Sequence, residues 1–168
     1  KRLNMELSRK ISAEITKYAV EYQADVIVFE YLEMQGKISG KKKQKLHLWR
    51  KRDIQKLCEH QAHRNGIRVS MVSARNTSRL ACDGSGAVVR NQENHSLCTF
   101  RTGKQYNCDL SASYNIGARY FIRELLKPLP ETERSSLEAK VPAVKRRTSC
   151  VYADLRKLYV EVNNLKAA

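Results

Sequence analysis

Apolar side chains recur at spacings of three and four residues along positions 1–22, which is typical of an amphipathic helix. The apolar positions are Leu3, Leu7, Ile11, Ile15, Tyr18 and Tyr22. Gln23-Ala24-Asp25 ends this predicted helix. The continuous apolar run Val26–Phe29 then predicts a short strand covered on both faces.

A second helix and a second strand follow the first pair. Residues 41–64 carry a partial apolar face, and Asn65-Gly66 ends that helix because both residues tolerate the left-handed conformation. Apolar and polar residues then alternate over 67–71, which predicts a strand. Residues 73–107 show no period and contain Gly84, Gly86 and Gly103, so they predict a looped insertion.

The last part of the chain predicts two more helices. One begins at Asp109 and ends near Pro128. Residues 128–149 hold all three prolines and a basic run, which predicts an exposed linker. Residues 151–163 regain helical spacing and predict a final helix that packs back.

Helices that alternate with strands predict an α/β layered fold. We divide the chain into a first part (1–72), an insertion (73–107), a returning helix (108–127), and a linker with a C-terminal helix (128–168). Two strands do not make a stable sheet alone, so we expect further strands upstream of Lys1. The chain starts without Met, and we interpret it as the C-terminal piece of a larger protein.

The charge of the chain indicates a polyanionic partner. Thirty-two Lys and Arg stand against 17 Asp and Glu, which gives a net charge of +15. Nucleic acid is the expected partner. Apolar runs are far shorter than the roughly 20 residues that span a membrane, so we expect no membrane association and a cytoplasmic, nucleoid-associated location. Five irregularly spaced cysteines argue against a disulfide framework, and Cys58, Cys108 and Cys150 are interpreted as small buried side chains.

Positive charge is densest between Lys37 and Lys56, where nine Lys or Arg accompany one acid, Asp53. A solvated helix face is the ordinary explanation, but the density favours a phosphate-binding surface. Arginines in the insertion extend this predicted phosphate-binding surface. The predicted nucleic-acid contacts are Lys41, Lys42, Lys43, Lys45, Arg50, Lys51, Arg52, Arg75 and Arg79.

Two carboxylates occupy positions suited to metal chemistry. Glu30 follows the predicted strand, where α/β sheets form ligand-binding crevices. Asp109 opens the predicted helix. Each has an ordinary alternative: Glu30 marks the end of the strand, and Asp109 caps the helix. Together they predict a site for Mg²⁺ or Mn²⁺, which prefer oxygen ligands.

With these residues identified, the chain resembles the C-terminal half of TnpB/OrfB-family, transposon-encoded RNA-guided nucleases, which are related to type V CRISPR effectors. The similarity covers roughly residues 1–125. It is carried by VIVFEYLE around Glu30, the helix and strand of 49–69, Asn76-Thr77-Ser78 before Cys82, and DLSASYNI over 109–116, which is similar to the family motif D-x-N-A-A-x-N-I.

The resemblance implies a partial RNase H-like (RuvC) fold, with Glu30 and Asp109 as second and third catalytic metal ligands. It implies phosphodiester hydrolysis by two Mg²⁺ ions, with guide RNA and target DNA as partners. The first ligand, an Asp, would lie upstream of Lys1, so this piece would not cleave alone. Ser111 stands where the family usually has Asn.

The insertion resembles a degenerate zinc ribbon. The family has two C-x-x-C pairs, but here Cys82 and Cys98 each keep only the first Cys. Structural Zn²⁺ needs four ligands, and His95 or Cys108 are the remaining candidates. Zinc binding and a metal-free loop are the alternatives, and the second is favoured.

The leading hypothesis is thus the RuvC-like nuclease portion of an RNA-guided DNA endonuclease. The alternatives are a catalytically inactive relative that binds nucleic acid, and a basic RNA-binding adaptor in which both acids have only structural roles. The sequence leaves the oligomeric state open.

Overall fold

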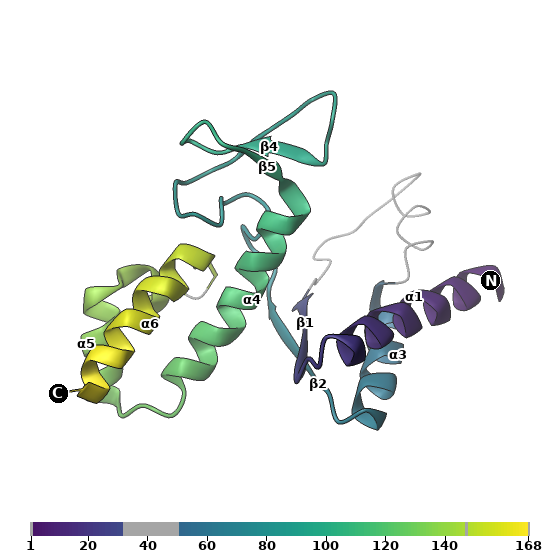
Figure 1. Cartoon of the computed structure of the whole chain (residues 1–168), viewed down its shortest axis with the longest axis horizontal. Helices are drawn as coiled ribbons and strands as arrows, with labels where there is room; N and C mark the ends of the chain where they lie inside the picture. The colour runs from purple at the N-terminus through teal and green to yellow at the C-terminus, as the bar shows by residue number, and fades with distance from the viewer. Residues whose placement is uncertain (1, 32–50, 147, 168) are drawn as a thin grey trace, which may run out of the picture. The chain divides into compact units, whose positions relative to one another are not determined.

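The computed structural model describes residues 2–31, 51–146 and 148–167 of the chain. The chain is a mixture of helices and small sheets, divided into two compact units, Lys1–Met71 and Val72–Ala168 (Figure 1).

The first unit has the predicted order of helix, strand, helix and strand. Its elements are α1 (Arg2–Glu21), β1 (Val26–Tyr31), α3 (Lys51–Arg64) and β2 (Arg68–Ser73), which begins here and ends in the second unit. The predicted helix over 41–64 is confirmed from Lys51, and 41–50 lie outside the described residues. Gly66, at φ +71°, follows the end of α3 as its sequence predicted.

Strands β1 and β2 pair with each other in a two-stranded sheet. The amide of Arg68 donates to the carbonyl of Asp25 at 2.9 Å, which joins the starts of the two strands and indicates that they run parallel. Ala19 of α1 and Ala62 of α3 are buried together with Ile67, and Ile27 and Val69 pack against them. The core of this unit therefore lies between the two helices and one face of the sheet.

The prediction that β1 is covered on both faces is wrong for the part of the chain that the structure describes. None of the six residues of β1 is fully buried. Successive side chains of a strand point to opposite faces. Ile27 reaches the cluster beneath the helices, whereas Val26 and Val28 belong to no buried cluster among the described residues.

The insertion in the second unit contains strands that the sequence analysis missed. They are β3 (Val89–Arg90), β4 (Leu97–Thr99) and β5 (Gln105–Asn107), joined in an antiparallel sheet. Arg90 is paired with Cys98, and Cys98 in turn with Tyr106. Strands of two or three residues are too short to produce a readable alternation, which is why the segment was predicted to be a loop.

Three helices and a short 3-10 turn form the rest of this unit. They are α4 (Cys108–Leu126), α5 (Glu131–Lys140), η1 (Pro142–Lys145) and α6 (Tyr152–Ala167). The predicted helices at 109–128 and 151–163 are confirmed, and α6 packs against α4 (Figure 1).

The predicted exposed linker over 128–149 is wrong, because most of it is helical and part of it is core. Leu137, Val141 and Val144 are buried with Ile122 of α4 and Leu158 of α6. Pro130 lies just before α5 and Pro142 opens η1. Proline suits the first turn of a helix because its fixed φ is already helical and its missing N–H has no partner there. These prolines begin elements and do not mark a linker.

Asn115 joins three segments of the second unit and is fully buried. Its Nδ2 donates to the carbonyls of Thr77 at 2.9 Å and Leu80 at 2.8 Å. Its Oδ1 accepts from the amide of Tyr152 at 3.1 Å, at the start of α6. One side chain on α4 thereby holds both the entrance of the insertion and the C-terminal helix.

We predict that Asn115→Ala lowers the free energy of unfolding by about 3 kcal/mol, because it removes a buried hydrogen bond to the carbonyl of Thr77 and partly buried ones to Leu80 and Tyr152. Urea denaturation measures the difference. Ser113→Ala, an exposed position on the same helix, is the control and should change the value by about 0.5 kcal/mol or less. Equal effects of the two substitutions would contradict this role of Asn115.

Candidate metal and nucleic-acid sites

Glu30 is the fifth of six residues in β1 and is half-buried. Its carbonyl oxygen accepts a hydrogen bond from Nε2 of Gln55 on α3 at 3.1 Å. The strand therefore continues one residue beyond Glu30, and the bond to Gln55 fixes its backbone against the neighbouring helix. A rigid strand end is suited to a metal-binding carboxylate because the backbone that carries it is set before any ligand arrives.

Asp109 lies in the first turn of α4 and is exposed, but it is not the helix cap. The N-cap is Asn107, whose Oδ1 accepts from the amides of Asp109 and Leu110, both at 2.9 Å. The alternative that assigned Asp109 to capping is therefore wrong. Asn107 satisfies the unpaired amides that an Asp would otherwise accept from.

The carboxylate of Asp109 makes no hydrogen bond or ion pair within the described part of the chain. Its place in the first turn sets it near the positive end of the α4 dipole, which stabilises its negative charge. An exposed carboxylate near a helix start fits the oxygen chemistry of Mg²⁺ or Mn²⁺.

Glu30 belongs to the first unit and Asp109 to the second. Their joint use as metal ligands therefore stays a prediction. Among residues 2–31, 51–146 and 148–167, no group of three or more His, Cys, Asp or Glu is gathered so that it could hold a metal ion. Two carboxylates from this chain would accordingly need a further ligand.

The rest of the motif that contains Asp109 has a structural role, which the sequence analysis missed. Ser111 is buried, and its Oγ accepts from the amide of Cys82 at 3.1 Å. Asn115 holds Thr77, Leu80 and Tyr152, as described above. Ser111 and Asn115 lie four residues apart on one face of α4, whereas Asp109 points to a different face. Their four-residue spacing, which places two polar side chains on one helix face, was the signal available in the sequence.

The thiols of the insertion lie in an apolar cluster. Cys98 and Cys108 are buried with Ala81 and Phe100, and Cys82, Val88 and Tyr106 pack against them. Burial, and next the neighbouring Cys108 thiol, raises the pKa of Cys98 to about 11. Zinc requires thiolates, whereas a protonated thiol packs as a small apolar group. Zinc at Cys82 and Cys98 stays the less favoured prediction.

All five cysteines are free thiols. Cys58, Cys108 and Cys150 are buried, as predicted, and Cys98 is buried as well.

The predicted nucleic-acid contacts fall partly outside the described residues. Five of these residues lie outside the described part of the chain: Lys41, Lys42, Lys43, Lys45 and Arg50. The side chain of Lys51 also lies outside it. Arg52 on α3 is exposed, as are Arg75 and Arg79 after β2.

Further exposed cations lie along the insertion. Two of them, Arg90 and Arg101, were not among the nucleic-acid contacts predicted from the sequence. Nζ of Lys104 lies 4.6 Å from the ring centroid of Tyr106, and the Arg101 side chain packs over Gly86. Their signal in the sequence was composition: the insertion has five Lys or Arg and two acids. The five cations are Arg75, Arg79, Arg90, Arg101 and Lys104, and the two acids are Asp83 and Glu93.

No known protein family and no curated protein matches this chain in sequence. Among solved structures, the chain is similar to a chain in the cryo-EM structure of a Cas12f1–sgRNA–target DNA complex. The similarity has 20% sequence identity and a TM-score of 0.47, and covers 68% of this chain and 33% of that one. This chain thus spans about a third of the length of the matched chain in that complex.

Of the helices that the structure describes, none combines the length and the apolar character needed to cross a membrane.

We predict that Cys82 is the fastest-reacting thiol of the folded chain, because the other four are buried. With a pKa of about 11, only about one thousandth of Cys98 is thiolate at pH 8. A chromogenic disulfide reagent at that pH measures the rates. Cys82→Ser should remove the fast phase, and Cys98→Ser, the matched control, should retain it. Loss of the fast phase in Cys98→Ser would contradict the packed cluster.

Proposed function

We propose that this chain is the C-terminal, RuvC-like nuclease portion of an RNA-guided DNA endonuclease, with Glu30 and Asp109 as metal-binding carboxylates. The observation that carries the proposal is that the polar residues at the start of α4 have different roles. Asn107 caps the helix, Ser111 and Asn115 hold the surrounding segments, and Asp109 is left exposed. An acid without a structural bond, at a site where its neighbours provide all of them, is a candidate for chemistry.

Asp109 and Glu30 would supply carboxylate oxygens to Mg²⁺ or Mn²⁺, with a further carboxylate from outside this chain. A divalent ion bound there would activate water and neutralise charge on the cleaved phosphodiester. The chain's own contribution is to fix the backbone that carries the carboxylates: the α4 cap sets the first turn that carries Asp109, and the bond from Gln55 fixes the backbone at Glu30.

The insertion would bind the phosphate backbone of guide RNA or target DNA. Its exposed cations include Arg75 and Arg79, in the turns between β2 and the small sheet, and Lys104, directly before β5 of that sheet. A folded insertion fixes the backbone that carries such side chains, which lowers the entropic cost when they meet phosphates. The excess of positive charge over the whole chain, +15, supports the same class of partner.

A binding-only relative is the second candidate. The observation that favours it is the apolar packing of Cys82, Cys98 and Cys108, which suits a domain that has lost a metal site. In such a protein the insertion would bind nucleic acid, and the two carboxylates would hold no metal.

We predict that Asp109→Asn in the complete protein with its RNA abolishes Mg²⁺-dependent DNA cleavage and leaves DNA binding unchanged. The amide keeps the size of the side chain but removes the charge that holds the ion. Cleavage and binding assays on one preparation measure both. Glu133→Gln, an exposed acid in α5, makes the same charge change and should cleave normally. Normal cleavage by Asp109→Asn would refute the proposal; no cleavage by the wild type, with binding retained, favours the binding-only relative.

We also predict that Arg75→Glu with Arg79→Glu weakens nucleic-acid binding and lowers the slope of log affinity against log salt by up to about 2, because fewer counterions are released. Titrations at several salt concentrations measure the slope. Lys127→Glu with Lys157→Glu makes the same change of charge on two exposed residues, the C-cap of α4 and a residue of α6. An equal loss in both double variants would show that only net charge matters.

A further inference from the structure

Helices α4 and α6 enclose a hollow of about 510 Å³ that is rimmed by aromatic side chains. Phe121 and Leu125 line it from α4, and Tyr152 and Tyr159 line it from α6. Phe121 is 55% and Tyr159 56% exposed. The two helices already pack against each other through their buried faces, so these exposed rings are not needed for that contact.

A cation lies between the two tyrosines on the same face of α6. Arg156 follows Tyr152 by four residues and precedes Tyr159 by three, which places all three side chains on one face of the helix. The ring of Tyr152 also lies 5.2 Å from the ring of Tyr114 on α4, between centroids, so the aromatic surface continues onto that helix. Aromatic rings beside a cation are typical of surfaces that bind single-stranded nucleic acid, because rings stack on bases and the cation meets phosphate.

The charge of this hollow favours an anionic partner. Among the described residues that line it, Arg156 is the charged one, and it forms no ion pair within the described part of the chain. The acids of α6 have partners of their own. Glu161 accepts from Nζ of Lys140 at 2.7 Å, and Asp154 accepts from the amide of Val151 at 2.9 Å. The positive charge of Arg156 is therefore not neutralised by its own helix.

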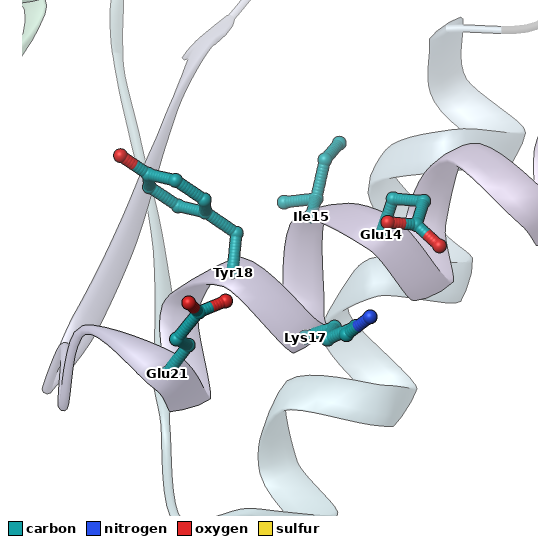
Figure 2. A pocket seen from close by; sticks show the side chains of 5 residues that line it. All are labelled: Glu14, Ile15, Lys17, Tyr18 and Glu21. Carbon is teal, nitrogen blue, oxygen red and sulfur yellow. The ribbon is translucent and has the colours of Figure 1, made fainter.

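A second hollow, on α1, has exposed aromatic surface but the opposite charge. It measures about 420 Å³, and Ile15 and Tyr18 project beside it from the same side of the helix (Figure 2). Its charged lining residues are Glu14, Glu21 and Lys17, so acids outnumber the cation. Such a rim repels a phosphate backbone. Exposed rings alone do not specify a nucleic-acid site, and the charge around them distinguishes the hollow between α4 and α6.

We propose that the hollow between α4 and α6 binds unpaired bases of a single-stranded nucleic acid, with Phe121 and Tyr159 stacking on base faces and Arg156 contacting phosphate. A single strand exposes the flat faces of its bases, whereas a duplex covers them. An apolar protein segment in the hollow would cover Arg156 without supplying an anion, which is costly. A second copy of this chain carries the same net charge of +15 and is repelled.

This inference rests on the nucleic-acid partner of the proposed function and not on cleavage, since it uses neither Glu30 nor Asp109. It adds a site for bases to the backbone contacts proposed for the insertion. The two kinds of site respond differently to experiment, because stacking depends on the bases and on their being unpaired, whereas contacts to phosphate depend on charge and salt.

Fluorescence anisotropy of the 168-residue chain with labelled oligothymidine of about 15 nucleotides tests the site. Phe121→Ser with Tyr159→Ser should weaken binding of this strand about 10-fold or more, because stacking is lost. Binding of a duplex of the same length should stay within about twofold. Tyr18→Ser with Tyr22→Ser is the control: it removes exposed rings from α1, leaves the charge unchanged, and should bind both like the wild type.

An abasic strand of the same length separates stacking from a general loss of folding. The wild type should bind oligothymidine more tightly than the abasic strand, and the Phe121→Ser, Tyr159→Ser variant should bind the two alike. Arg156→Gln should lower the slope of log affinity against log salt by about 0.7 for the single strand, whereas the double variant should keep the slope of the wild type. Both variants replace exposed side chains, and circular dichroism verifies that they fold.

Three results would overturn the inference. If the Phe121→Ser, Tyr159→Ser variant binds oligothymidine as tightly as the wild type, the hollow takes no bases and a protein segment is its occupant. Equal losses for the single strand and the duplex would mean that the rings do not distinguish unpaired bases. In both cases the wild type still binds nucleic acid, so the proposed function stands. A wild-type chain that binds none of the strands overturns the base site and the nucleic-acid partner together.

Discussion

The second unit depends on the hydrogen bonds made by one buried polar face of α4. Ser111, Asn115 and Arg119 follow one another at four-residue spacing, and all three are buried. Polar groups in such positions are costly unless they are hydrogen-bonded. Their partners are the amide of Cys82, the carbonyls of Thr77 and Leu80, the amide of Tyr152, and the carbonyls of Ser73 and Cys150. One helix face thus fixes β2's end, the insertion and the C-terminal helix.

This arrangement explains why the insertion and the tail belong to one folded body. The amide of Ala153 donates to the carbonyl of Cys82 at 2.9 Å, so α6 is also bound directly to the insertion. Gly84 makes that approach possible, because a Cβ there would lie only 3.1 Å from Cβ of Ala153. Its φ of +82° also favours glycine. The buried side of α4 is committed to structure, which leaves the exposed start of the helix for Asp109.

The first unit has the opposite character, since its packing leaves much apolar surface unused. Among the described residues, its sheet has two strands and its hydrophobic cluster has three buried residues, with Ala24, Ile27 and Val69 packed against them. Helix α1 packs against α3 through serine, threonine and alanine side chains, and its leucine and tyrosine side chains are exposed. The large apolar side chains of α1 thus take no part in the described core of this unit.

Several elements could be predicted from the sequence because their signals are local. Helices α1, α4 and α6 show apolar residues at helical spacing, β1 and β2 are apolar or alternating runs, and Gly66 ends α3. The candidate acids Glu30 and Asp109 were found from their places beside such elements, and their use together stays a prediction. Side-chain type and spacing specify a helix or a strand because backbone geometry repeats over a few residues.

Only the tertiary structure decided which surfaces these elements share. It placed Asn107 rather than Asp109 at the cap of α4, built a sheet from strands of two and three residues, and turned the proline-rich segment into α5 and η1 around Leu137. It also buried the face of α1 that carries small side chains. The physical reason is that a repeat in the sequence fixes the kind of element, whereas burial is settled by competition among all surfaces for the same partners.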